Sequence, residues 1–320
     1  MAQASSRRHF LALLRPALCR EYPPMLNFLI LLTLLAADAS ANRWSRPEYA
    51  GVFTDPELSE VSGLAASRSR DGLYWALNDS GDGEKLFAIK SDGSRVATYR
   101  VLGAKNVDWE DLDSFELDGK HYLMVADTGD NGGIRKVLTL YFFEEPSTIR
   151  DGGTMRPAWS INFRWPDGAR DCEATAVDPV NGEVLLISKK RVPPELFRLP
   201  LHPGDELQTA QLVTKLTGIE QPSGSDLQRN PVYGRYRSQI TAADLSPNGR
   251  VLAVLTYRSI HLYVRAPQQD WRQAMRTLPV ELDFPWLPQA EGIAFSTDGR
   301  SLLVGSEQRP SPLLQFHVLP

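Results

Sequence analysis

The feature that most constrains the fold is a short segment that recurs five times. In each copy, two polar residues lie two positions apart, directly before a mostly apolar run. The copies are residues 60–62, 108–110, 171–173, 239–241 and 289–291. Alternate residues of an extended strand share one face, so each copy predicts a strand that begins with polar side chains and continues with residues such as Leu112. Five such strands predict a ring of oxygen atoms at one end of a common axis.

A hairpin signal follows each polar segment. Asp-Gly and Asn-Gly readily adopt the positive φ angles of tight turns between antiparallel strands. These turns begin at Asp71, Asp118, Asn181, Asn248 and Asp298, and each precedes a hydrophobic run. Repetition of such a unit every roughly 50 to 70 residues is typical of a β-propeller.

We therefore predict an all-β fold, a five-bladed β-propeller whose central channel carries an oxygen-lined cation site. The blades would begin at the five polar segments, and the strand at 315–319 would close the ring against residues 49–53. Six blades would require a degenerate blade within 147–170 or 212–238. We expect one propeller domain over residues 42–320.

Composition excludes several classes of partner. The chain has 320 residues, 42% of them hydrophobic, a formal net charge of −4 and a pI of about 5.8. This balance indicates neither a nucleic-acid partner nor binding to a membrane surface.

Residues 1–41 are predicted to be a leader. The apolar run at 26–37 is shorter than the roughly 20 residues of a membrane span. It ends in Ala39-Ser40-Ala41, a pattern that signal peptidases cut, which places cleavage before Asn42. A start at Met1 gives an unusually long, basic n-region, whereas a start at Met25 places the apolar run well but leaves an n-region without Lys or Arg. We take Met25 as the start. We expect a periplasmic or secreted protein with no membrane span after cleavage; the alternative is an uncleaved anchor.

Cleavage would leave one cysteine, Cys172, and a single thiol forms no internal disulfide. Because its neighbours are the polar residues of the repeat, Cys172 should point away from them into the core. We interpret it as a packing residue; the alternative is a nucleophile.

The polar ring predicts a metal site. Glu110, Glu173 and Glu291 would converge with the hydroxyls of Ser62 and Thr241, and three close carboxylates need a counter-charge to stay ionised. Calcium accepts oxygen ligands with loose geometry, which suits donors from five strands. No histidine is among the residues of this ring, which argues against zinc. The alternative is a water-filled polar channel.

These segments resemble the inner strands of calcium-activated nucleotidases of the apyrase type. That family is a five-bladed propeller with a Ser/Glu/Glu/Ser/Glu calcium cage, and Thr241 stands where the family has its second Ser. Residues 78–82 and 127–131 look instead like bacterial exported phytase-like propellers. The resemblance implies the fold and the calcium cofactor more securely than the substrate.

The second strand of each blade should return to the end where the first began, which predicts a charged mouth around the ring. The substrate-binding candidates there are Asp79, Asp127, Asp130, Arg135, Lys189, Arg191 and Arg258. The cations among them are suited to holding phosphate. The segment 127–133 is either a calcium loop or, more commonly for such sequences, an acidic β-turn.

Two functions remain open. The first is a calcium-dependent phosphoester or phosphoanhydride hydrolase, with Asp108 or Glu60 as the general base and a small phosphorylated substrate. The second is a non-catalytic propeller that binds an exported partner and uses calcium structurally. Fold alone does not separate them.

Overall fold

The structure is a computed structural model that describes residues 44–202, 204, 207–309 and 311–320. The predicted leader, the start at Met25 and the cleavage site lie outside the described residues. The described residues form one compact unit.

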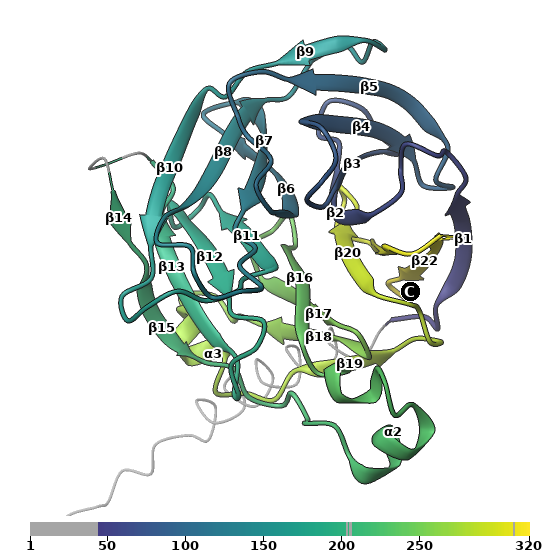
Figure 1. Cartoon of the computed structure of the whole chain (residues 1–320), viewed down its shortest axis with the longest axis vertical. Coiled ribbons are helices and arrows are strands. Elements are labelled where there is room, and N and C mark those ends of the chain that lie inside the picture. Colours follow the sequence, from purple (N-terminus) through teal and green to yellow (C-terminus); the bar gives the residue numbers. More distant parts are fainter. Residues whose placement is uncertain (1–43, 203, 205–206, 310) are drawn as a thin grey trace, which may run out of the picture. The chain divides into compact units, whose positions relative to one another are not determined.

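Five sheets make up this unit, and each begins with a strand at one of the polar segments (Figure 1). The first sheet contains β2 (Val61–Ala66), β3 (Leu73–Asn78), β4 (Lys85–Lys90), β5 (Arg95–Val101) and β9 (Gly153–Met155). The second contains β6 (Trp109–Leu117), β7 (Lys120–Asp127), β8 (Leu138–Glu144), β10 (Trp159–Arg164) and β14 (Gln208–Thr209). The third contains β11 (Ala174–Asp178), β12 (Glu183–Ile187), β13 (Glu195–Pro200) and β15 (Gln211–Lys215).

The fourth sheet contains β16 (Ile240–Leu245), β17 (Val251–Thr256), β18 (Ser259–Val264) and β19 (Val280–Asp283). The fifth contains β20 (Ala290–Phe295), β21 (Ser301–Ser306), β22 (Ser311–His317) and, as its outer strand, β1 (Glu48–Phe53). The inner strands β2, β6, β11, β16 and β20 pack in this order, and β20 packs on β2 (Figure 1). The prediction of a five-bladed propeller is therefore confirmed.

Ring closure also follows the prediction. The first strand of the propeller pairs antiparallel with the last, with Gly51 opposite Leu313 and Phe53 opposite Ser311. This pairing joins the two ends of the described chain within one sheet.

A sixth blade is absent from the described residues. Within 147–170, β9 and β10 extend the first and second sheets. Within 212–238, the end of β15 is followed by two short helices, α2 (Gly224–Arg229) and η1 (Gly234–Tyr236). A third short helix, α3 (Trp271–Ala274), lies between β18 and β19. Among the described residues, no helix is long and apolar enough to cross a membrane.

The β6–β7 hairpin shows how the turn residues act. Asp118 and Gly119 have φ angles of 51° and 73°, the left-handed pair that Asp-Gly turns favour. Such turns align the hydrophobic strands, and the side chains of these strands fill the spaces between blades.

Apolar clusters between adjacent blades form the core. Cys172 lies in one of them with Phe197 and Trp165, and it is fully buried. Burial raises the pKa of its thiol to about 12, which opposes a nucleophilic role. The interpretation of Cys172 as a packing residue agrees with this position.

Candidate metal site

A β-bulge opens the inner strand of four blades and turns one side chain out of the regular alternation. In the first blade, Val61 pairs with Asn78 and Gly63 with Leu77, so Ser62 is the extra residue. The pairings of β6, β16 and β20 shift in the same way at Glu110, Thr241 and Glu291.

The third blade follows the same pattern just before its inner strand. The amide of Lys189 donates to the carbonyl of Asp171, whereas Ala174 already pairs with Ile187, so the segment around Glu173 carries one extra residue. All five predicted ligands thus occupy equivalent places, and each is at most 6% exposed. Bulges of this kind re-aim side chains beside functional sites.

The bulge also corrects the assumption that residues two apart share one face. Leu112 packs with Trp75 and Leu123 between the first two blades. Asp111 and Asp113 instead accept hydrogen bonds from β11, in the third blade. Because of the extra residue, the polar face of the strand continues through Asp111 and Asp113, whereas the sequence predicted that it would continue through Leu112.

Two overlapping groups of carboxylates lie at the ring. Glu110, Asp171 and Glu173 each offer an oxygen within 4.8 Å of the others, and so do Asp79, Asp108 and Glu110. Glu110 belongs to both groups. Asp171 was not predicted as a ligand, although it is the first residue of its polar segment. Asp79 and Asp108 were predicted as substrate-binding and catalytic residues, and the structure brings both into the second of these carboxylate groups.

Burial dominates the electrostatics of this cluster. It raises the pKa of Glu110 well above its usual range, and the charges of Glu173, Asp79 and Asp108 add to the effect. Burial likewise raises the pKa of Glu173, which Lys189 opposes. At the half-buried Asp79, burial together with Asp108 and Glu291 raises the pKa to about 6.

Lys189 lies inside the ring rather than at its rim. Its Nζ pairs with Oε1 of Glu173, and it lies 5.6 Å from the centre of the Tyr257 ring. The other oxygen of Glu173, Oε2, is buried and has no hydrogen-bond partner in the described part of the chain.

The remaining glutamate of the predicted cage, Glu291, has two partners that the sequence placed near the mouth but did not name as site residues. The Tyr257 hydroxyl donates to Oε1 of Glu291 at 2.7 Å. Burial and the neighbouring Glu291 raise the pKa of Glu307 to about 9. Tyr257 and Glu307 both directly follow the second strand of their blade, and this position was the available signal.

The two hydroxyl residues of the predicted cage bridge neighbouring inner strands. Ser62 Oγ donates to the carbonyl of Trp109 at 3.1 Å, and Thr241 Oγ1 donates to that of Ala290 at 2.6 Å. Each hydroxyl proton is therefore used within the protein, while the oxygen lone pairs remain available to a cation.

The loop after β7 is a turn held in shape by contacts among its own residues. The Asp130 carboxylate accepts hydrogen bonds from the amides of Ile134 and Arg135 at 2.8 and 3.0 Å. Arg135 contacts Asp127 at 2.9 Å and donates to the Gly129 carbonyl at 2.7 Å. These contacts favour the β-turn interpretation over the calcium loop, and they occupy Arg135 within the protein.

The other predicted mouth residues are more accessible. Glu60 and Arg191 are exposed. Arg258 is partly exposed and approaches Glu220 and Asp226 only at 3.9 Å.

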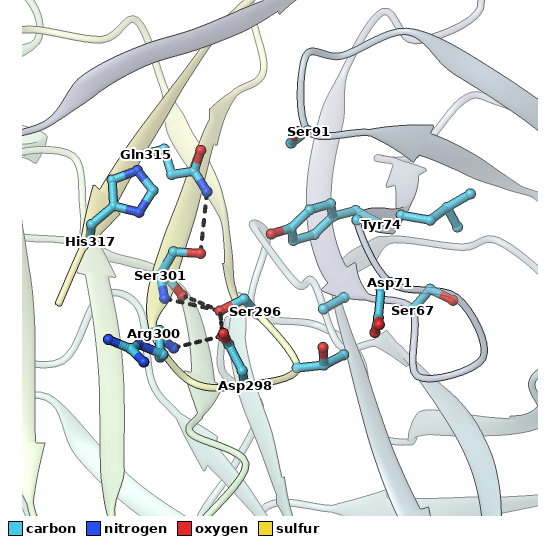
Figure 2. A pocket seen from close by; sticks show the side chains of 14 residues that line it. Ser67, Asp71, Tyr74, Ser91, Ser296, Asp298, Arg300, Ser301, Gln315 and His317 are labelled. Atoms are coloured by element: carbon cyan, nitrogen blue, oxygen red, sulfur yellow. Dashed lines mark hydrogen bonds between the residues drawn. The ribbon is translucent and has the colours of Figure 1, made fainter.

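A separate pocket of about 660 Å³ lies between the first and fifth blades, at the end of the inner strands that is opposite to the candidate metal site. Figure 2 shows Tyr74 and Ser301 facing each other across it, with Gln315 donating to Ser301 Oγ at 3.2 Å. The predicted site residues are not among those that line it.

No protein-family model matches the chain, and no curated protein matches it. A solved structure titled "Structure of U3-55K" is similar over 80% of this chain and 67% of that chain, with 16% identity and a TM-score of 0.37. A likeness of this size carries no conclusion about function, and the five-bladed arrangement rests on the strand pairing described above.

Proposed function

We propose that this chain is an exported calcium-binding propeller that holds Ca²⁺ on its axis. The observation that carries the proposal is the buried Oε2 of Glu173, which has no hydrogen-bond partner among the described residues and lies in a cluster with Glu110 and Asp171. A buried carboxylate oxygen without a partner is costly, and a hard cation provides the missing interaction.

The donor set suits calcium. Calcium takes about six to eight oxygen ligands in flexible geometry. Besides the three clustered carboxylates, Glu291 and the hydroxyl oxygens of Ser62 and Thr241 occupy the equivalent bulge positions. All of these donors are oxygens, which favours calcium over metals that prefer nitrogen or sulfur.

Calcium titration of chelator-treated protein tests the proposal. Calcium should raise the melting temperature of the wild type, because a ligand that binds only the folded state stabilises it. Glu173→Gln should abolish this rise. Glu116→Gln, at an exposed position of β6, is the matched control and should behave like the wild type. A wild-type protein that neither retains calcium nor gains stability from it would refute the site.

Calcium-dependent hydrolysis of a phosphoester or phosphoanhydride is the second candidate. It is supported by the resemblance to apyrase-type nucleotidases and by the accessibility of Glu60, Arg191 and Arg258, three residues of the predicted mouth. A bound calcium would polarise phosphate oxygens. Phosphate release from a panel of nucleotides and other phosphoesters, with and without calcium, tests this function.

The non-catalytic alternative is a binding module for an exported partner, with calcium as a structural ion. It is supported by two ion pairs at the mouth, Arg135 with Asp127 and Lys190 with Asp171. These pairs occupy cations within the protein that a phosphate group would otherwise need. A folded, calcium-loaded protein without turnover on the phosphoester panel would favour this alternative.

Export is part of the proposal and rests on the leader sequence. The protein recovered from outside the cytoplasm should begin at Asn42, as read by N-terminal sequencing. A retained segment 26–37 would instead indicate an anchor.

A further inference from the structure

Lys189 takes a place that a bound cation would need. It follows β12 closely, and its amide donates to the carbonyl of Asp171 at 3.2 Å, so the backbone is held beside the carboxylate cluster. The side chain is 8% exposed, and its ammonium pairs with Glu173, a predicted calcium ligand.

This lysine lies among the glutamates of the predicted cage. Its ammonium pairs with Glu173 and lies 5.6 Å from the centre of the Tyr257 ring, and the hydroxyl of that tyrosine donates to Glu291. The lysine therefore supplies positive charge at the place where the sequence led us to expect a metal ion.

Its neighbour Lys190 has a different role. Lys190 is 43% exposed and contacts Asp171 Oδ2 and Asn131 Oδ1 at 2.8 and 2.7 Å. It ties the mouth loops of two blades together from outside. Lys189 is thus the member of the pair that enters the ring.

We propose that Lys189 is a tethered competitor for the cation site. Its ammonium offsets the charge of Glu173 when no ion is bound, and it must leave Glu173 before a divalent cation binds there. A monovalent ion offers these carboxylates no more charge than the ammonium does, so the lysine also selects for divalent ions. This inference rests on the proposed calcium site.

Lys189→Met tests the inference through two effects of opposite sign. The calcium-free variant should melt at a lower temperature than the wild type, because the buried carboxylates lose their counter-charge. Its calcium dissociation constant should fall by about tenfold or more, since a neighbouring charge at this range shifts an equilibrium by that factor. Lys189→Arg, which keeps the charge, should retain weak binding. Isothermal titration and melting with and without calcium measure both effects.

A purely structural lysine would give a different result. Its loss would lower the melting temperature in both states and leave calcium binding equal or weaker, and that outcome would overturn the inference. Lys120→Met, which removes an exposed pair with Glu144, is the control and should change neither quantity. If the wild type itself binds no calcium, the proposed site fails, and the inference with it.

The wild-type protein provides a test that does not depend on the variant folding. In chelator, Lys189 should resist acylation by an amine-reactive reagent, because its ammonium is buried and paired. Saturating calcium should release it, and the modification of Lys189 measured by peptide mass spectrometry should rise several-fold, while that of Lys120 stays constant. Unchanged labelling of Lys189 in calcium-saturated protein would contradict displacement.

Discussion

The carboxyl group of Asp111 on β6 accepts a hydrogen bond of 2.6 Å from the backbone amide of Thr175 on β11. The same oxygen also accepts from the amide of Ala243 on β16, at 3.5 Å. One side chain thus links the inner strands of three blades. In the described chain these inner strands belong to separate sheets, so the amides on their axial edges need acceptors other than a β-ladder.

Two further aspartates act in the same way. Asp113 accepts from the amide of Val177, and Asp244 accepts from that of Phe295 at 2.6 Å. Further along the inner strands, buried aspartates therefore satisfy backbone amides, whereas the candidate metal site lies where these strands begin.

Asp111→Asn should lower the free energy of unfolding by about 1–3 kcal/mol, because an amide nitrogen would face backbone N–H groups and leave a buried donor unsatisfied. Urea denaturation measures the loss. Asp118→Asn, in the exposed β6–β7 turn where asparagine tolerates positive φ, is the control and should change stability little. A variant as stable as the wild type would show that these contacts contribute nothing to the fold.

Stability should depend on pH through Asp113. Burial raises its pKa to about 6, with Arg68 and several hydrogen bonds opposing the shift. Burial and the nearby Asp113 raise the pKa of Asp244. The folded protein therefore binds more protons than the unfolded chain between about pH 4 and 6, and the free energy of unfolding falls as pH rises through this window, by up to about 1.4 kcal/mol per pH unit for one group.

Asp244→Asn should flatten that fall, because it removes a second buried carboxyl group whose pKa is raised, and the asparagine can still accept from Phe295. Urea denaturation at about pH 4 and about pH 6 compares the two proteins at the limits of this window. An identical pH dependence in the variant would contradict the assignment to this pair.

Gly129→Ala should weaken calcium binding by about 10- to 100-fold, the range seen when support around metal ligands is lost. A Cβ at Gly129 would collide with the carboxylates of Glu110 and Asp108. Gly132→Ala, in the same loop, has only the Ile134 side chain nearby, at 3.7 Å, and is the matched control. Equal calcium affinity in the two variants would mean that the cluster beside Gly129 does not hold the ion.

Asp108→Asn and Glu60→Gln should separate metal binding from catalysis. Asp108 lies in the carboxylate cluster, so its substitution should weaken calcium binding. Glu60 is exposed at the mouth. If the protein hydrolyses phosphoesters with Glu60 as the base, Glu60→Gln should reduce kcat by about 10²–10⁴ and leave calcium affinity unchanged. Parallel calcium titration and phosphate-release assays measure both. Full activity in Glu60→Gln would exclude Glu60 as the base.

The blade count and the order of strands were predictable from local sequence. Tight-turn dipeptides and hydrophobic runs depend on the φ preferences and side chains of a few adjacent residues, so pairs such as Asp118-Gly119 identify each hairpin directly. The repeat spacing then leaves few architectures besides a propeller. The equivalence of Ser62, Glu110, Glu173, Thr241 and Glu291 was predictable for the same reason, because each occupies one place in a repeated unit.

The partners of those residues depended on contacts between blades. Nothing local to Lys189 distinguishes it from Lys190, yet one ammonium enters the ring and the other stays outside. The bulges that re-aim the ligands, and the joining of Asp111 to Thr175 across 64 residues of sequence, arise only when the five inner strands meet. The sequence by itself determined the repeated unit and the residues at its polar end. Only the tertiary structure decided which charges neutralise one another, because electrostatic interactions depend on distance and burial, and both are set by how the blades close around the axis.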